Sequence, residues 1–380
     1  MNNKRILIAN RGEIATRIAR ACRELGHTSV GIWTEFEVNA KHLEFCDEWV
    51  FLQGKNNRET YLDIQKILKL AEDHRIDAIH PGYGFLSENG AFALACEQAG
   101  IVFIGPNPKA IKAMGDKATS KEVAKKAGIP VVPGSTQAVP TVEEAIKIAK
   151  QIGYPVLLKA VAGGGGRGMR QCFSDQDIIK NFEAVGREAL ASFANAELLV
   201  EKYILNPHHI EVQILADKNG NVYHFFEREC SIQRRHQKII EEAPSPFIGE
   251  DEELRKRLCD TAVKLARAVG YDSAGTVEFV MGADRNFYFL EMNTRIQVEH
   301  PITEEITGVD LIVCMIQGAF GESLGIPSQE LIKRTGHAIE CRICAEDPIT
   351  MLPAPGKVTG FETNFPQGTR FDNCLYKGLQ

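Results

Sequence analysis

Strand and helix patterns alternate along the first 110 residues, and this alternation limits the possible folds more than any other feature. Short apolar runs at Arg5–Ala9, Ser29–Trp33 and Ala78–His80 read as strands. Between the first two, Glu13–Leu25 carries apolar residues at helical spacing, and Gly26 ends that helix. Such alternation predicts an α/β fold with a parallel sheet covered by helices on both faces. The turn after the first strand lacks the GxGxxG pattern, so nothing here indicates a dinucleotide.

Two further blocks follow the first. A lysine-rich helix is predicted from Lys117 to about Ala127, then a helix at Val142–Gln151 and a strand at Pro155–Ala160. From Leu198 onward the chain is richer in strands, which we expect at Glu211–Ala216, Val222–Glu229, Ala274–Met281 and Phe287–Glu291. This organisation favours two α/β lobes that close on a nucleotide.

A glycine-rich loop at Gly163–Gly168 gives the first strong chemical signal, with five glycines in six residues. Glycines let a backbone approach a ligand closely, and successive free N–H groups bind anionic oxygens, most often phosphate. A mobile linker is the alternative, but the loop lies between two strand patterns. No Gly-Lys-Ser/Thr closes it, so it is not a P-loop. Lys159, in the apolar strand before the loop, is a candidate phosphate ligand; a lysine at a sheet edge with its ammonium in water is the alternative.

Two glutamates on neighbouring strands give the second signal. Thr276–Met281 and Asn286–Met292 are predicted to form a hairpin, in which Glu278 and Glu291 can face one another. Facing carboxylates repel unless a cation lies between them, and Mg²⁺ takes such ligands together with substrate phosphates. Solvated structural glutamates are the alternative, weakened by the apolar neighbours of both residues.

Polar residues alternate with apolar ones beyond the hairpin. If this segment stays extended, its polar residues share one face. They are Glu291, Asn293, Arg295, Gln297 and Glu299. An exposed edge strand would also alternate, but five polar groups of mixed charge would be costly to bury without a ligand.

Two further segments carry charge or potential metal ligands. Residues 234–238 include four cationic or potentially cationic side chains, which indicate either an anion site or a solvated basic loop. His208 and His209 could suggest a metal, but adjacent histidines rarely chelate one ion, and we expect no third ligand near them.

Charge and cysteine usage exclude several classes of protein. The formal net charge is −6, which gives no sign of nucleic-acid or membrane binding. No apolar run approaches the roughly 20 residues of a membrane span, and we expect a cytoplasmic protein. The ten cysteines lack framework spacing and are expected to be free thiols. Cys341 and Cys344 form a CxxC, which we interpret as two thiols on opposite faces of a strand rather than a zinc or redox site.

Taken together, these motifs resemble the biotin carboxylase family of the ATP-grasp superfamily, from residue 4 to about 378. The segments that carry the resemblance are Ile8–Ile14, His80–Asn89, Met114–Lys117, Gly163–Met169, Glu201–Tyr203, Gln233–Lys238, Glu291–His300 and Glu340–Arg342. The resemblance implies a Rossmann-like N-terminal domain at 1–115 and an ATP-grasp domain at 116–320 with a lid at about 130–205. Residues 321–380 would form the start of a truncated, β-rich C-terminal lobe.

The resemblance also implies site residues. ATP would contact Lys117, Lys159, Gly165, Gly166, Glu201, Lys202, Tyr203, Ile204, His209, Gln233 and His236. Among these, the backbone groups of Lys202 and Ile204 would read the adenine edge. Mg²⁺ (or Mn²⁺) would be held by Glu278 and Glu291, with Asn293 close by. Bicarbonate would be held by Lys238, Arg295, Gln297 and Val298, with Glu299 as its general base. Tyr83 and Arg342 would serve biotin.

The implied reaction is the first half-reaction of an acetyl-CoA or pyruvate carboxylase. The Ala-Met-Lys-Met attachment signature is absent, so biotin would arrive on a carrier protein or domain, and a carboxyltransferase would be the other partner. The family's third lobe continues beyond Gln380, so homodimer formation is expected of the full-length module. Two alternatives stay open. One is another ATP-grasp ligase, against which Lys238, Arg295–Glu299 and Arg342 argue. The other is a nucleotide-binding module that is inactive alone.

Overall fold

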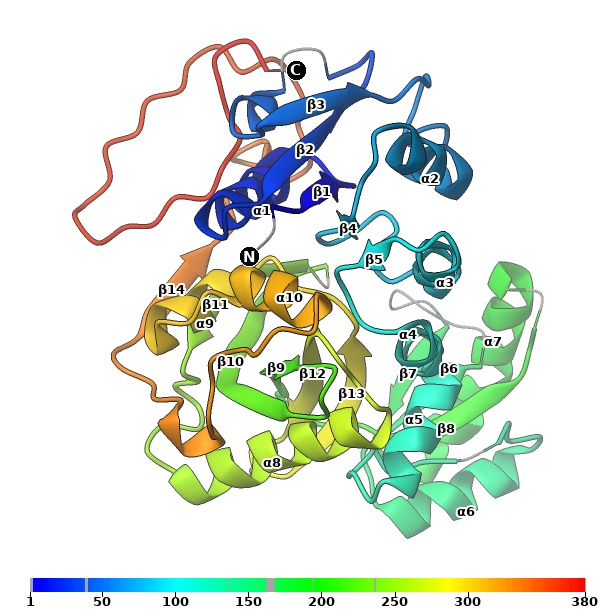
Figure 1. Cartoon of the computed structure of the whole chain (residues 1–380). Coiled ribbons are helices and arrows are strands. Elements are labelled where there is room, and N and C mark those ends of the chain that lie inside the picture. Colours follow the sequence, from blue (N-terminus) through cyan, green and yellow to red (C-terminus); the bar gives the residue numbers. More distant parts are fainter. Residues whose placement is uncertain are drawn as a thin grey trace.

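The structure is a computed structural model that describes residues 3–37, 40–135, 137–161, 168–193, 195–235 and 237–379, without the side chains of residues 192 and 193. Its strands form three sheets, of five, three and six strands. Figure 1 shows the five-stranded sheet and the six-stranded sheet stacked one above the other, with the three-stranded sheet beside the latter.

The first lobe contains the five-stranded sheet, whose strands are all parallel in the order β3-β2-β1-β4-β5. The expectation of a parallel α/β sheet is therefore confirmed. Asn89 caps α3, since its side chain accepts from the Phe92 amide. The elements are β1 (Arg5–Ile8), α1 (Gly12–Glu24), β2 (Thr28–Trp33), β3 (Glu48–Phe51), α2 (Ile64–Asp73), β4 (Ala78–His80), α3 (Gly90–Gln98), β5 (Val102–Phe103) and α4 (Pro108–Gly115).

A small antiparallel sheet follows helix α5 (Lys117–Lys126), in the order β7-β6-β8. Lys159 on β6 pairs with Met169 on β7, so the two strands flank the glycine-rich segment as expected. The remaining elements are α6 (Val142–Ile152), β6 (Val156–Ala160), β7 (Met169–Cys172), α7 (Asp175–Phe193) and β8 (Leu198–Lys202). The helices pack on this sheet around two small apolar clusters of their own.

The six-stranded sheet is antiparallel, in the order β13-β12-β9-β10-β11-β14. Its strands are β9 (His208–Ala216), β10 (Val222–Arg234), β11 (Gln237–Ala243), β12 (Ala274–Met281), β13 (Phe287–Asn293) and β14 (Ala338–Cys341). Three helices accompany it, namely α8 (Glu252–Ala268), α9 (His300–Thr307) and α10 (Leu311–Ala319).

Buried contacts join the first lobe to this sheet. Helix α1 and helix α10 share one apolar core. The buried Arg17 on α1 lies 2.9 Å from Glu304 on α9 and 2.6 Å from Asp310, at the start of α10. Because α9 begins directly after Glu299, these contacts fix the segment that precedes it relative to the first lobe.

One prediction about secondary structure is wrong. Cys341 ends β14, and Cys344 lies beyond the strand with its thiol exposed, so the two cysteines do not lie on opposite faces of one strand. The separation arises because the chain leaves the sheet after Cys341. Among the described residues, no helix is long and apolar enough to span a membrane.

Candidate functional site

A row of charged side chains crosses four strands of the six-stranded sheet. Glu278 on β12 lies directly opposite Glu291 on β13 and opposite Glu211 on β9. Glu211 in turn faces Arg228 on β10. The predicted pairing of Glu278 with Glu291 is therefore confirmed. Three carboxylates in consecutive cross-strand positions repel one another, so the row requires cations to be stable.

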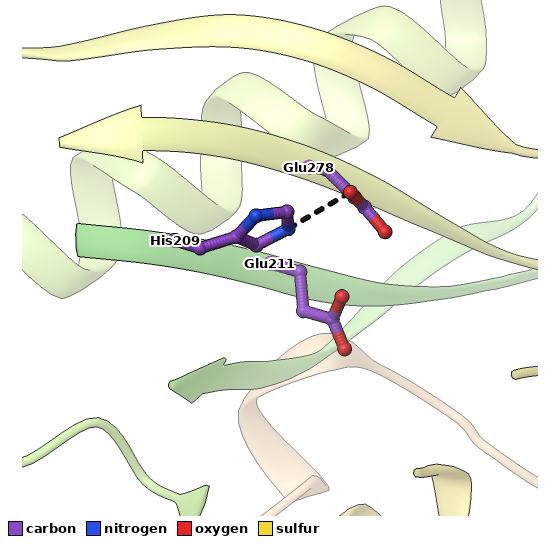
Figure 2. Close-up of side chains that lie close together, drawn as sticks. All are labelled: His209, Glu211 and Glu278. Carbon is purple, nitrogen blue, oxygen red and sulfur yellow. Dashed lines mark ion pairs between the residues drawn. The ribbon is translucent and has the colours of Figure 1, made fainter. Parts of the chain in front are cut away.

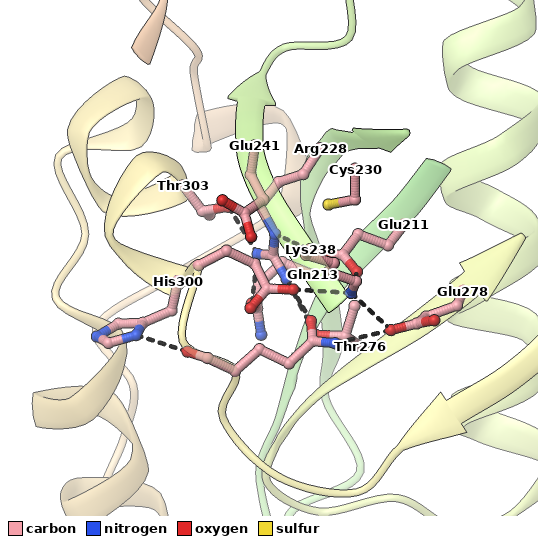
Figure 3. A network of polar contacts seen from close by, with 12 residues as sticks. Glu211, Gln213, Arg228, Cys230, Lys238, Glu241, Thr276, Glu278, His300 and Thr303 are labelled. Carbon is pink, nitrogen blue, oxygen red and sulfur yellow. Dashed lines mark hydrogen bonds and ion pairs between the residues drawn. The ribbon is translucent and has the colours of Figure 1, made fainter. Parts of the chain in front are cut away.

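Lys238, on β11, supplies one of these cations. Its Nζ lies 2.5 Å from Glu211, 2.8 Å from Glu278 and 2.7 Å from Glu299, and all three carboxylates are buried. Figure 3 shows Lys238 among these acidic side chains. Burial alone would lower the pKa of Lys238, but the three glutamates raise it far above its ordinary value. Lys238 is therefore a permanent ammonium ion in the centre of the site.

Arg228 is the second cation, and its side chain is completely buried. Burial by itself opposes the charged form, yet Glu211 and Glu299 keep its pKa raised. Its guanidinium donates to five side chains, those of Glu211, Gln213, Thr276, Gln297 and Thr303. These bonds join β9, β10, β12 and the segment before α9 into one rigid unit. Burial raises the pKa of Glu211, but Arg228 and Lys238 outweigh it and bring the value to about 2.

His209 lies beside two of these glutamates. Its Nε2 is 2.8 Å from Glu278, and its ligand atoms lie within 4.8 Å of those of Glu211 and Glu278 (Figure 2). Burial lowers the pKa of His209, but Glu278 outweighs burial and raises it. The expectation that no further ligand lies near the His208–His209 pair is wrong, because a strand places His209 and Glu211 on one face. His208 instead contacts Glu229, at 3.0 Å.

Glu291 has fewer cations near it than Glu278. Glu278 is bonded to Lys238, Asn293 and Gln297, and its pKa is lowered, because His209 and Lys238 outweigh burial. The Lys117 ammonium lies 4.0 Å from the Glu291 carboxylate, and the Lys117 side chain is largely exposed. Burial and the Glu278 charge both raise the pKa of Glu291. Two carboxylates and the Asn293 amide offer the hard oxygen ligands that Mg²⁺ prefers, so this donor set fits a divalent cation.

The polar residues after β13 converge on the site, although not as an extended strand. β13 ends at Asn293, and Glu299 is the residue before α9. The condition that the segment stays extended to Glu299 is therefore not met, because the chain bends at Thr294–Arg295 and turns at Val298–Glu299 before α9 begins. Asn293 and Gln297 both donate to Glu278. The side chains meet through these turns rather than through a two-residue period.

Arg295 connects this segment to the first lobe. Its guanidinium lies 2.9 Å from Glu88, and the Glu88 carboxylate also accepts from the Thr294 amide, at 3.0 Å. Arg295 additionally donates to Asn293, at 3.2 Å. Val298 is half-buried in the turn before α9. Arg295, Gln297 and Val298 thus lie together along one short segment.

Arg342 approaches the site from just beyond β14. Its Nη2 lies 2.9 Å from Glu299 and 2.6 Å from Glu241. Glu241 is fully buried on β11, directly opposite Glu340 on β14. Burial raises the pKa of Glu241 to about 7, with Arg342 opposing the shift and Glu299 adding to it. Burial, Glu241 and Glu299 raise the pKa of Glu340 to about 8.

Three of the residues expected to bind nucleotide, Lys159, Glu201 and Lys202, lie on the three-stranded sheet. Glu201, on β8, accepts from Lys121 at 2.8 Å and from Lys159 at 3.5 Å. Although burial raises the pKa of Glu201, the two lysines lower it below its ordinary value. The Lys202 amide donates to the Pro133 carbonyl at 2.7 Å, so this N–H cannot serve as a donor to adenine.

The Lys202 ammonium donates to the carbonyls of Gly153 and Tyr154. Tyr203 accepts from Gln171 at 2.7 Å, and Ile204 follows it directly.

The described residues of the basic segment 234–238 lie at the end of β10 and the start of β11. Arg234 pairs with Glu346, and Lys238 with the three buried glutamates, so their charges serve different partners. Gln233 donates to the Cys230 carbonyl at 2.8 Å, and its amide lies 3.2 Å from the His209 ring. Gly165, Gly166 and His236 lie outside the described residues.

Tyr83 belongs to a different contact network. Its hydroxyl donates to Glu13 of the first lobe, and its ring packs against the apolar core between the lobes. Within the described ranges, no hydrogen bond joins Tyr83 to Arg342. The structure therefore places Arg342 beside Glu299 of the predicted bicarbonate site, while the Tyr83 hydroxyl is bonded to Glu13.

Several site residues were missed in the sequence, and two of them, Glu211 and Gln213, carried a signal. His209, Glu211 and Gln213 alternate with Ile210, Val212 and Ile214, which is the pattern that identified the later strand. Arg228 stands between Glu227 and Glu229 in the sequence, so its complete burial had no local signal. Lys121, Glu88 and Glu241 carry no local signal, because their partners are distant in the sequence.

Two family models match the chain. Residues 2–111 match the N-terminal domain of biotin carboxylase, and residues 116–326 match the ATP-binding domain of the carbamoyl-phosphate synthase L chain.

Full-length comparisons extend these matches. A biotin carboxylase of Nostoc sp. is 51% identical over 100% of this chain and 85% of its own length. A pyruvate carboxylase subunit from Methanothermobacter thermautotrophicus is 51% identical over 99% of this chain and 76% of its own length. Among solved structures, the biotin carboxylase domain dimer of Hydrogenobacter thermophilus 2-oxoglutarate carboxylase, in complex with MgADP, ADP and bicarbonate, has a TM-score of 0.87. It is 51% identical, over 99% of this chain and 82% of that one.

Proposed function

The chain belongs to the biotin carboxylase family, and from this premise we propose which of its residues carry out the ATP-dependent carboxylation of biotin with bicarbonate. The second family model is described as part of carbamoyl-phosphate synthase. The N-terminal family model and the full-length relatives distinguish this chain from that enzyme. One observation carries the proposal for the site: Glu299 is buried between Lys238 and Arg342, at 2.7 and 2.9 Å. Glu299 thus lies between two cations and close to Glu278, one of the two glutamates that we propose to bind Mg²⁺. This arrangement suits a reaction between two anions, bicarbonate and ATP.

We assign the bicarbonate site to Lys238, Arg295, Gln297 and the Val298 backbone. Bicarbonate is a poor nucleophile, and Glu299 would remove its proton as it attacks the γ-phosphate of ATP, with ADP as the leaving group. Lys238 and Arg295 would stabilise the charge that develops as carboxyphosphate forms. Mg²⁺, when bound by Glu278 and Glu291 with Asn293 close by, would supply charge neutralisation at the phosphates. Arg342 would stabilise the enolate-like oxygen of the biotin ureido ring.

The nucleotide would lie between the three-stranded and six-stranded sheets. Lys117 and Lys159 would meet its phosphates, with Gly165 and Gly166 above them. Glu201, Lys202, Tyr203 and Ile204 would line the adenine pocket, with the Lys202 carbonyl and the Ile204 backbone as the hydrogen-bonding groups. His209, Gln233 and His236 would contact the sugar or phosphates. Residues 130–205 would act as the lid of the ATP-grasp domain, and Tyr83 would contact biotin from the first lobe.

The function is tested by measuring ADP release with ATP, Mg²⁺ and bicarbonate, with and without free biotin. We expect biotin to increase the rate and omission of bicarbonate to abolish the increase. Stimulation by ammonia in place of biotin would instead identify another ATP-grasp ligase. Nucleotide binding without any biotin-dependent release would identify a module that is inactive on its own.

Replacing Glu291 by Gln is expected to weaken the binding of Mg²⁺ roughly tenfold or more, judged by the loss typical of metal-site substitutions. In the unchanged protein, the apparent Mg²⁺ affinity should fall as the pH is lowered, because the raised pKa of Glu291 makes it take up a competing proton at a higher pH than an ordinary glutamate. Both effects are measured by Mg²⁺ titration of nucleotide fluorescence at several pH values. Equal Mg²⁺ affinity in the variant would contradict the assignment. Glu305→Gln, on the exposed side of α9, is the matched control.

We propose that the biotin comes on a carrier protein or domain and that a carboxyltransferase uses the product, since the relatives include a subunit of pyruvate carboxylase. We also propose a homodimer, by analogy with the dimeric domain of the 2-oxoglutarate enzyme. The free cysteine thiols suit a reducing compartment, and we therefore assign the protein to the cytoplasm. Acetyl-CoA and pyruvate are the acceptors we propose for the second half-reaction.

A further inference from the structure

A second group of carboxylates lies next to Arg342, on β11 and β14. Glu241 and Glu340 occupy directly opposite positions on β11 and β14. The side chain of Glu241 is completely buried, and that of Glu340 is partly buried. Neither residue has a place in the mechanism given above. Figure 3 shows Glu241 at the edge of the buried network, on the side of Arg228 and Thr303.

The charges around this pair do not balance. In the described cluster, five carboxylates face three permanent cations: Glu211, Glu241, Glu278, Glu299 and Glu340 against Arg228, Lys238 and Arg342. Even with a proton on His209, which pairs with Glu278, one negative charge is in excess. An excess buried charge is removed most easily by protonation of the carboxylate with the poorest partners.

Hydrogen bonding identifies which carboxylates those are. Glu211 accepts from Arg228 and Lys238, and Glu278 accepts from Lys238, Asn293 and Gln297. In the part of the chain that the structure describes, no hydrogen bond reaches either oxygen of Glu241 or Oε2 of Glu340. Arg342 Nη2 lies 2.6 Å from Glu241 without hydrogen-bond geometry. A protonated carboxyl on this pair would gain a neighbour to which it can donate.

From this arrangement, and resting on the proposed function, we propose that Glu241 and Glu340 form a proton-holding pair that positions Arg342 for biotin carboxylation. While the pair holds its proton, the strongest anionic partner of Arg342 is Glu299, on the reaction side. When the pair loses the proton, Glu241 competes with Glu299 for the guanidinium and draws it toward β11. Glu241 and Glu340 are thus positioning residues that act through Arg342.

The raised pKa values of the two carboxyls agree with this role, at about 7 for Glu241 and about 8 for Glu340. Four charged groups face Glu241 and Glu340. They are Arg342 just after β14, Glu299 before α9, Glu211 on β9 and Arg228 on β10. Glu299 and Glu211 oppose ionisation of the pair, whereas Arg342 and Arg228 favour it. The pair would therefore ionise over a range just above neutral pH.

The test compares Glu241→Gln, which mimics the protonated carboxyl, with the unchanged protein. The control is Glu242→Gln, the next residue on β11, whose carboxylate pairs with His337 instead. Biotin-dependent ADP release is measured from pH 6 to pH 9, beside bicarbonate-dependent release without biotin. For Glu241→Gln we expect kcat within about twofold at pH 6.5 and an alkaline decline in the biotin-dependent rate that begins at least one pH unit later.

The thermal midpoint supplies a second readout that does not depend on activity. A carboxyl whose folded pKa is raised makes the native state bind more protons than the unfolded state, so stability falls as the pH rises from the ordinary carboxyl value toward 8. Glu241→Gln should reduce that fall, and Glu242→Gln should not.

Each remaining outcome decides the question. A loss of more than tenfold in a folded Glu241→Gln protein at pH 6.5 would overturn the proposal, because the ionised form would then be the active one. An unchanged pH profile and an unchanged pH dependence of the midpoint would also overturn it. Failure of the unchanged protein to show biotin-dependent release would count against the proposed function instead, while the midpoint measurement would still judge the carboxyl pair.

Discussion

Replacing Glu299 by Gln should lower biotin- and bicarbonate-dependent ATP cleavage by ~10²–10⁴-fold, the usual loss when a general base is removed. Glutamine keeps the shape of the side chain but cannot accept the bicarbonate proton. It also removes the charge that Lys238 and Arg342 share, at 2.7 and 2.9 Å. Nucleotide binding should change little, because Glu299 lies on the bicarbonate side of the site. Steady-state ADP release and a separate ATP-binding titration measure the two effects.

A matched variant separates this role from a general effect on α9. Glu305→Gln alters a half-exposed carboxylate on the same helix, whose recorded partner is Arg370 at 3.5 Å. It should leave the rate within about twofold, as expected of a surface substitution. If Glu299→Gln kept full biotin- and bicarbonate-dependent cleavage, Glu299 would not be the base.

Replacing Arg228 by Met should lower the free energy of unfolding by about 3–5 kcal/mol, more than any other variant proposed here. The loss arises because the substitution removes one partner of a buried ion pair. The substitution leaves Glu211 with Lys238 as its remaining cation and deprives Gln213, Thr276, Gln297 and Thr303 of a shared donor. Such a loss is a large part of the stability of an ordinary domain. Urea unfolding followed by fluorescence and by circular dichroism measures it, and the two probes together reveal any intermediate.

Two variants check the cause of this loss. Arg228→Lys keeps the charge but not the five-way donation, so it should be less destabilising than Arg228→Met. Arg187→Met removes an arginine that is 72% exposed on α7 and should change the stability by no more than about 0.5 kcal/mol. Equal unfolding midpoints for Arg228→Met and the unchanged protein would contradict the structural role given to Arg228.

The sequence predicted the elements that have a strong local period. The strands at Ala78–His80 and Ala274–Met281 were placed at the residues where the structure has them, and the helix from Lys117 ends one residue earlier than expected. Helix α8 was missed, although its buried positions recur at helical spacing. Local periodicity was thus sufficient for the type of these elements, but not for residues 294–299.

Long-range convergence could not be predicted in this way. Glu88 and Arg295 meet across 207 positions, and Arg17 and Glu304 across 287. Neither pair repeats at a helical or strand period, so only the tertiary fold reveals it. For residues 294–299, the side chains come together as predicted, but the predicted extended strand is absent. Turns instead bring Gln297 and Glu299 to the site.

The three-stranded sheet with α6 and α7 has apolar clusters separate from those of the two larger lobes. It is therefore a candidate for a subglobal unfolding unit, which can open while the six-stranded sheet stays closed. Amide hydrogen exchange would then be faster in β6, β7 and β8 than in β9 or β12, and proteases would cut there first. A nucleotide bound to this unit would make its opening less favourable. The local stability of the three-stranded sheet would therefore depend on whether a nucleotide is bound.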